Sequence, residues 1–282
     1  MNDYHFTLAG IRTVLRTPYP ITISESLQPF LCTQHEDAEY IIELQVCDSL
    51  PPISQDGLWH GAEYYDCHQG TSRIFHCAAQ AAAAFAVTQL FETGNIKISI
   101  LPEYLSYFTG TAGIFNRIGM ETLLLQHHGL LLHASLIKYN GNAIAFSGPS
   151  GVGKSTQADI WNKYLGAQIL NGDRAAVRQA AQTWIAYGSP YAGTSGIYKN
   201  DSAPLRAIII LRQGAQNQFL PLTPGEALRY LYPELSIHHW DKTFVENATD
   251  LCLQLLSQTP VYLLECLPQE SAALLTKKGL GL

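Results

Sequence analysis

The stretch Gly148-Pro-Ser-Gly-Val-Gly-Lys-Ser-Thr156 carries the strongest structural signal in this chain of 282 residues. It fits the pattern G-x-x-x-x-G-K-[ST], which is that of the phosphate-binding P-loop. The apolar residues 143–147 precede it and predict a short buried strand, and residues 157–165 favour a helix. Because a P-loop joins a strand to a helix, this context predicts a binding site for a nucleoside triphosphate with magnesium.

The residue types in this stretch match what a bound phosphate requires. Gly148, Gly151 and Gly153 allow the backbone to curl with its N–H groups pointing inward, and the helix start that follows adds its positive dipole end. Lys154 supplies a cation for the β- and γ-phosphates, and Ser155 supplies a hydroxyl ligand for Mg²⁺. The expected nucleotide-binding residues are Gly148, Ser150, Gly151, Val152, Gly153, Lys154, Ser155 and Thr156.

Composition and charge indicate a globular chain and limit the classes of partner that it could bind. Hydrophobic residues make up 47% of the sequence and charged residues 14%, as in a folded domain. The net charge of −6 and the absence of a basic cluster argue against nucleic acid as the main partner. No apolar run approaches the ~18 residues of a membrane-spanning helix, and the N-terminus shows no signal pattern. We therefore expect no membrane partner.

We expect a cytoplasmic protein, and an intracellular P-loop protein would keep its cysteines reduced. None of them forms a C-x-x-C pair, which argues against a zinc ribbon or a redox pair. We expect them to remain thiols and most of them to act as small buried hydrophobic residues. The pairs Cys67-His68 and His76-Cys77 would form a metal site only if the fold brought them together, and other sequence signs of zinc are missing.

Two parts are expected along the chain: a strand-rich N-terminal module at residues 1–125 and a nucleotide-binding domain at residues 126–282. Residues 39–46 and 95–100 alternate between apolar and polar side chains, which predicts strands. The alanine-rich residues 77–87 fit either a helix or a tightly packed strand.

The remaining patterns predict an α/β fold with antiparallel elements in its sheet rather than a regular βαβ repeat. Residues 111–127 predict one amphipathic helix, with Gly129 as its stop signal, and Pro224 fits the first turn of a later helix. Strands are expected at 130–137, 143–147, 167–170, 175–178, 184–187, 205–211 and 261–264. Helices are expected at 156–165, 224–233, 242–257 and 269–278.

A P-loop needs a carboxylate that positions magnesium, and such an acid usually ends a hydrophobic strand. The apolar residues 205–211 end at Arg212 with no acid, whereas residues 167–173 end at Asp173. Asp173 is therefore the best candidate for a metal ligand, a general base, or both. The alternative is a structural turn or helix-cap aspartate, which Asn171-Gly172-Asp173 also fits.

Three basic side chains have two interpretations each. His133 lies in an apolar strand, fifteen positions before Gly148, and is either a core histidine or part of the site. Arg174 and Arg206 would either contact phosphates or pair with carboxylates. Spacing alone does not separate these alternatives.

With these residues in place, the span from about His128 to Leu211 resembles the HPr kinase/phosphorylase family, whose core is similar to phosphoenolpyruvate carboxykinase. In that family a histidine precedes the P-loop at the distance of His133. An acid ends a strand shortly after the P-loop helix, as Asp173 does here. Gly188-Ser189-Pro190 is similar to a Gly-x-x-Pro segment that follows in the family. The chain looks most like divergent members that act as stand-alone or peptide-tailoring serine kinases.

The resemblance implies a mixed-sheet α/β core of the HPr kinase type that uses ATP and Mg²⁺. It implies transfer of phosphate to a serine or threonine hydroxyl of a small protein or peptide. Residues 1–125 do not resemble the N-terminal domain of that family, and we expect them instead to form a docking surface for the substrate. The implied catalytic residues are Asp173, which takes the hydroxyl proton, His133, which tunes or holds Asp173, and Lys154, which neutralises charge. The implied magnesium ligands are Ser155 and Asp173.

The chain departs from the family pattern at three points. Thr156 stands where the family has glutamate, Gly172 stands where it has the first of two aspartates, and the Glu-Ile-Arg-Gly loop is absent. Two alternatives follow. One is a kinase for a small metabolite, with a pocket lined by Arg174, Arg206 or Lys199. The other is a nucleotide-binding regulatory module with little turnover.

Overall fold

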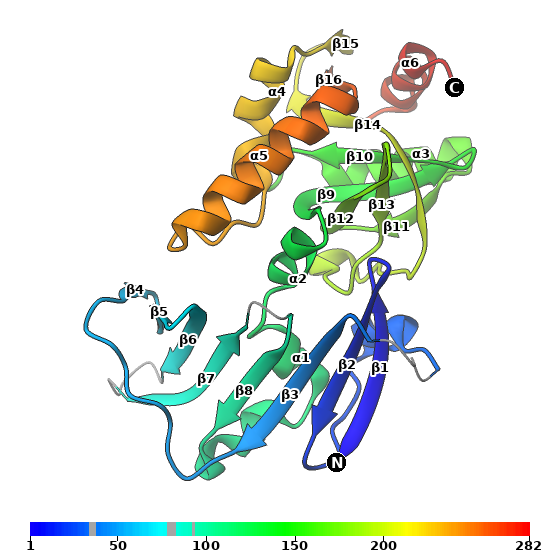
Figure 1. Cartoon of the computed structure of the whole chain (residues 1–282). Helices are drawn as coiled ribbons and strands as arrows, with labels where there is room; N and C mark the ends of the chain where they lie inside the picture. The colour runs from blue at the N-terminus through cyan, green and yellow to red at the C-terminus, as the bar shows by residue number, and fades with distance from the viewer. Residues whose placement is uncertain (34–37, 78–82, 92–93) are drawn as a thin grey trace. The chain divides into compact units, whose positions relative to one another are not determined.

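The computed structural model describes residues 1–33, 38–77, 83–91 and 94–282. The chain divides into two compact units, Met1–Leu123 and Leu124–Leu282, which we call the N-terminal unit and the C-terminal unit (Figure 1). Among the helices in the described part of the chain, none is long and apolar enough to cross a bilayer.

The N-terminal unit is built on one eight-stranded sheet in the order β1-β2-β3-β8-β7-β6-β5-β4. The pairs β2–β3 and β3–β8 are parallel and the other pairs are antiparallel. The strands are β1 (Asn2–Leu8), β2 (Ile11–Thr17), β3 (Tyr40–Val46), β4 (Leu58–His60), β5 (Glu63–His68), β6 (Thr71–Cys77), β7 (Ala84–Leu90) and β8 (Ile96–Ile100). The predicted strand-rich module is confirmed.

Short helical segments accompany this sheet. They are η1 (Glu25–Phe30), η2 (Pro102–Phe108) and α1 (Thr111–Phe115), and a further helix, α2 (Met120–Gln126), spans the boundary between the two units. The strand predictions for residues 39–46 and 95–100 correspond to β3 and β8. Within the alanine-rich run, residues 78–82 lie outside the described residues, and residues 84–87 form the start of β7, so that part is a strand.

The single helix predicted over residues 111–127 is wrong. α1 and α2 are separate, and between them Gly119 has a φ of +75°, which an α-helix cannot continue through. Gly129 is also no helix stop, because it is the first residue of a strand. A Cβ at Gly129 would lie 2.6 Å from Cγ of Arg178, so close strand packing requires the glycine.

The C-terminal unit contains a second eight-stranded sheet, in the order β10-β9-β12-β13-β14-β16-β15, with β11 paired to β9 and β10 also paired to β14. β10–β14 and β14–β16 are parallel, and the other pairs are antiparallel. Its strands are β9 (Gly129–Tyr139), β10 (Asn142–Ser147), β11 (Gln168–Asn171), β12 (Arg174–Ala180), β13 (Thr183–Tyr187), β14 (Ser202–Gln213), β15 (Gln218–Pro221) and β16 (Val261–Cys266). The predicted α/β fold with a mixed sheet is confirmed.

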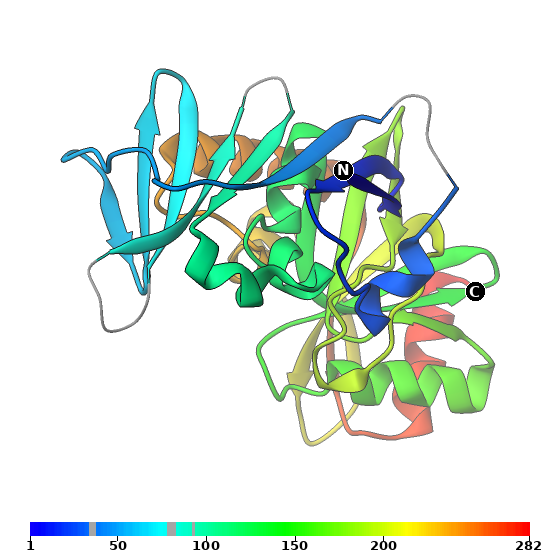
Figure 2. The same cartoon turned by 90° about the horizontal axis from the view of Figure 1, so that it is seen from below.

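Helices cover both faces of this sheet. α4 (Pro224–Leu231) and α5 (Lys242–Gln258) pack into one apolar core, and α3 (Lys154–Leu165) and α6 (Glu270–Leu280) pack into the other. Figure 1 shows α4 beside α5, and Figure 2 shows α3 (green) beside α6 (red). Two 3-10 turns, η3 (Gly193–Ser195) and η4 (Tyr232–Glu234), complete the unit.

The two cores explain the sequence pattern of the central strand β14. Ile208 and Ile210 belong to the core under α4 and α5, and Ile209 and Leu211 belong to the core under α3 and α6. A strand that is buried on both faces has a continuous run of apolar residues, and that run is why the sequence predicted this strand.

Each of the seven strands and four helices predicted for this unit is present, with ends shifted by a few residues. Pro224 opens α4 as expected, and Thr223 with Glu226 completes a capping box there. The sequence did not predict β15, which is four residues long and ends in Pro221. That proline is tolerated because β15 is an edge strand paired only with β16.

Candidate active site

The predicted P-loop connects the end of β10 to the start of α3. Its glycines adopt backbone angles that other residues rarely take: φ is +140° at Gly148, +78° at Gly151 and +114° at Gly153. Ser150 and Ser155 are exposed. The loop therefore presents its backbone and the first turn of α3 to solvent, as a phosphate cradle must.

Lys154 folds back over this loop. Its Nζ donates hydrogen bonds to the carbonyl oxygens of Gly148, at 2.7 Å, and Pro149, at 3.1 Å, and the residue is only 7% exposed. Burial lowers the pKa of Lys154, and the negative charges of Glu234 and Asp173 act against that effect. Both carboxylates thus lie close enough to act on the ammonium group of the P-loop.

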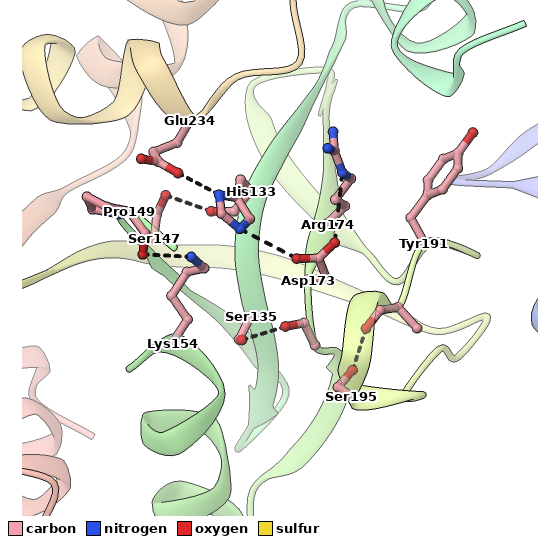
Figure 3. A network of polar contacts seen from close by, with 12 residues as sticks. His133, Ser135, Ser147, Pro149, Lys154, Asp173, Arg174, Tyr191, Ser195 and Glu234 are labelled. Atoms are coloured by element: carbon pink, nitrogen blue, oxygen red, sulfur yellow. Dashed lines mark hydrogen bonds and ion pairs between the residues drawn. The ribbon is translucent and has the colours of Figure 1, made fainter. Parts of the chain in front are cut away.

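His133 is not a core histidine. It lies on β9, directly opposite Arg174 of β12, and its ring is partly exposed. Nδ1 is 2.7 Å from Oε2 of Glu234, and Nε2 is 3.5 Å from Oδ1 of Asp173 (Figure 3). The ring therefore lies between two carboxylates, with one at each nitrogen.

Asp173 follows β11, but its side chain does not hold the turn. That role belongs to the buried Asn171, whose Oδ1 accepts from the backbone N–H groups of Asp173 and Arg174 at 2.8 and 2.7 Å. The carboxylate of Asp173 instead faces His133 and lies 3.9 Å from Nε of Arg174. The side chain of Asp173 therefore contacts other charged side chains and does not stabilise the turn.

Two glycines pack closely around this acid. Gly193 has a φ of +54°, and a Cβ there would lie 2.8 Å from Cγ of Asp173. A Cβ at Gly172 would overlap the side chain of Ser195, whose hydroxyl donates to the carbonyl of Ala192. In this chain the loop that contains Ser195 thus occupies the space that an aspartate at position 172 would need.

Glu234 is the site residue that sequence reasoning missed. It lies in η4, just after α4 and 101 positions from His133. The backbone brings it there: Leu235 forms a β-bridge with Leu132, and the N–H of Ser236 donates to the carbonyl of Leu131 at 3.0 Å. No local pattern marks a glutamate in such a position, so only the tertiary fold reveals it.

The other two candidate basic residues, Arg174 and Arg206, lie in different parts of the C-terminal unit. Arg174 lies at the site and also donates a hydrogen bond to Oγ of Ser236. Arg206 instead donates to the carbonyl of Leu280 at 3.0 Å, near the end of α6. It is also on the part of β14 that pairs with the start of β10, whereas the P-loop follows the end of β10. Arg174 and Arg206 therefore do not line one pocket.

The cysteine–histidine pairs do not meet. Cys67 lies opposite Ser72 in the β5–β6 pairing, four positions from the Glu63–His76 pair. Both ring nitrogens of His76 are engaged, Nδ1 with Glu63 at 2.9 Å and Nε2 with Thr88 at 2.8 Å. Within the described ranges no group of three or more histidine, cysteine or acidic side chains could hold a metal ion, and no disulfide joins any of the six cysteines, all of which lie in those ranges.

Fold and site together define a mixed-sheet α/β protein in which a glycine-rich loop with the sequence pattern of a P-loop adjoins a polar cluster. Residues 119–268 match the family model described as "SynChlorMet cassette protein ScmC", and the chain belongs to that family. A solved structure titled "Structure of the Hpr(Ser) kinase/phosphatase from Coxiella burnetii" is similar at 12% identity, covering 54% of this chain and 97% of that one with a TM-score of 0.31. A search of curated proteins finds no match.

Proposed function

We propose that this chain is an ATP- and Mg²⁺-dependent phosphotransferase that phosphorylates a serine or threonine hydroxyl of a small protein or peptide. One observation carries the proposal: the side chains of Lys154, His133 and Asp173 gather in one place beside the P-loop (Figure 3). A phosphate cradle and a carboxylate that can accept a proton are the two parts that such a transfer needs.

The residues present fit a bound magnesium ion. Mg²⁺ is usually held by one or two protein oxygens together with substrate phosphates and water, so a complete protein cage is not required. Ser155 offers an exposed hydroxyl in the first turn of α3, and Asp173 offers a partly exposed carboxylate. When bound, the ion would neutralise charge on the phosphate oxygens. ATP would lie along the P-loop, with Lys154 turning from the carbonyl oxygens to phosphate.

In the proposed reaction the acceptor hydroxyl oxygen attacks the γ-phosphorus. A new P–O bond forms as the bond between the γ-phosphorus and the β–γ bridging oxygen breaks, and ADP leaves with that electron pair. Asp173 accepts the hydroxyl proton, and Lys154 compensates the charge on the phosphates. Catalysis of this kind depends on positioning and electrostatics rather than on covalent help from the protein.

A kinase for a small anionic metabolite is the second candidate, and the observation in its favour is Arg174. Its side chain is 43% exposed and lies beside Asp173, where it could bind an acidic acceptor. A regulatory module with little turnover is the third candidate, because Gly172 leaves only one acid after β11. For each of these functions we propose a cytoplasmic location, where ATP is available and thiols stay reduced.

The test is transfer from γ-labelled ATP, with Mg²⁺ and a library of proteins and peptides, followed by mass spectrometry of the products. Lys154→Ala removes the cation of the P-loop. Lys163→Ala is the matched control, because Lys163 is exposed in the last turn of the same helix. We expect phosphoserine or phosphothreonine with wild type and Lys163→Ala but not with Lys154→Ala. ATP binding without any phosphorylated polypeptide would reject a protein kinase.

A further inference from the structure

The basic side chains of His133 and Arg174 flank Asp173. Each of them also contacts a second polar side chain, and both of these second partners belong to residues 234–236. His133 contacts Asp173 through Nε2 and Glu234 through Nδ1. Arg174 contacts Asp173 through Nε and donates to Ser236 through Nη1. Residues 234–236 thus provide partners for both groups that lie beside the proposed base.

The backbone of this segment is fixed by β9, the strand that also carries His133. Leu235 is bridged to Leu132, and the N–H of Ser236 donates to the carbonyl of Leu131. On its other side the segment follows α4, whose last residue, Leu231, is fully buried in the core. The backbone segments that carry Glu234 and His133 are therefore held next to each other by pairing.

The contact between Glu234 and His133 has the features of a strong orienting hydrogen bond. It is short, at 2.7 Å, and the side chain of Glu234 is only 10% exposed, so water competes little for it. Glu234 and Asp173 contact opposite nitrogens of the ring. The imidazole therefore lies between Glu234 and Asp173, and the Glu234 carboxylate has the place that an orienting carboxylate has beside a histidine in other active sites.

We propose that Glu234 is a positioning residue that acts through His133, and that Ser236 does the same through Arg174, so that residues 234–236 hold both basic groups in place around Asp173. The kinetic consequence rests on the proposed function. The structural consequence, a fixed His133 ring with its Nδ1 proton held by Glu234, does not.

The structural part is tested by NMR of the whole chain with ¹⁵N-labelled histidine. We expect wild type to show a downfield hydrogen-bonded Hδ1 signal from His133, identified by its loss in His133→Gln. Glu234→Ala should abolish this signal. Glu226→Ala should retain it, because Glu226 is an exposed residue that caps α4, the helix before η4, and its carboxylate bonds to Thr223. A signal that persists in Glu234→Ala, or that is absent from wild type, would overturn the proposal.

The kinetic part uses the transfer assay. Loss of a residue that orients a functional histidine typically costs about 10- to 100-fold. We expect Glu234→Ala to lower kcat by that factor and to leave the KM for ATP within about twofold of wild type. Added to His133→Gln, Glu234→Ala should lower kcat no further. A full additional loss would show that Glu234 does not act through His133. A wild-type chain without transfer would reject the proposed function, and the NMR result would still decide the role of Glu234.

Discussion

The carboxylate of Asp173 is packed against a residue with no side chain. Gly193 approaches it so closely that a methyl group would lie 2.9 Å from Cβ and 3.0 Å from Oδ2 of Asp173. Gly193 also has a φ of +54°, which disfavours other residues independently of the contact. The position of the proposed base thus depends on this glycine.

Gly193→Ala tests that dependence, with Gly196→Ala as its control. Both positions have positive φ, +54° and +64°, so each substitution carries a similar backbone cost of about 1 kcal/mol. Only position 193 contacts Asp173, since a Cβ at Gly196 meets no atom within 4 Å. We expect transfer activity to fall at least about tenfold in Gly193→Ala and to be nearly unchanged in Gly196→Ala. Equal losses would contradict the account.

Among single residues, the sequence could propose as site candidates only those that belong to a local pattern. The P-loop residues, His133 and Asp173 could be proposed because they lie within one continuous stretch of two strands, a loop, a helix and a third strand. Glu234 could not, because the Leu132–Leu235 bridge that places it joins residues about a hundred positions apart. Non-local pairing of this kind leaves no periodic or spacing signal in one sequence.

At the scale of elements, the connection between β11 and β12 is held by Asn171. Its Oδ1 accepts from two backbone N–H groups, and its Nδ2 donates to the carbonyl oxygens of Ser189, at 2.9 Å, and Tyr191, at 3.0 Å. One buried amide thus joins the strand that leads to Asp173 with the loop that leads to Gly193. This turn therefore supports both sides of the proposed base.

Asn171→Ala should destabilise the protein by about 3 kcal/mol, because it leaves several buried polar groups without partners. Asn142→Ala is the matched control, since its amide makes an exposed bond to the carbonyl of Asn140. We expect that change to stay within about 0.5 kcal/mol. Urea denaturation of the three proteins measures the free energies of unfolding, and similar values for the two variants would refute the role given to Asn171.

Element boundaries show which sequence signals are strong. A long apolar run located β14, and a proline suited to a first helical turn located the start of α4. The separation of α1 from α2 was missed, because the apolar pattern continues across Gly119 while the backbone does not. Edge strand β15 was missed because it is short and contains a proline.

At the scale of the whole molecule, folding stabilises the charged form of several carboxyl groups and so lowers their pKa values. In the N-terminal unit, burial alone would raise the pKa of Asp66, but hydrogen bonds from Arg73 and from the backbone of Ser54 outweigh it and lower the pKa. The pKa of Asp201 in the C-terminal unit is lowered, chiefly by the hydrogen bond from Lys138. A carboxyl group whose pKa is lower in the folded than in the unfolded protein contributes stability at pH values above its unfolded pKa. That contribution is lost as the pH falls through the folded pKa.

The protein should therefore lose stability below about pH 4, the ordinary range of aspartate. Asp66→Asn should also destabilise at pH 7, by about 3 kcal/mol, because it leaves the buried Arg73 without its carboxylate. Between pH 5 and pH 3 the variant should lose less stability than wild type, since it lacks the Asp66 carboxyl group, whose pKa is lowered in the folded protein. Urea midpoints at both pH values measure this. An equal or steeper loss in Asp66→Asn would contradict the assignment.

The proposed function requires that this chain transfer phosphate with Asp173 as the proton acceptor. The most direct measurement compares wild type and Asp173→Asn for single-turnover transfer from γ-labelled ATP and, in parallel, for ATP binding by calorimetry. We predict that transfer falls by about 10²- to 10⁴-fold, the usual contribution of a general base, while ATP still binds. Full transfer activity in Asp173→Asn would contradict the account.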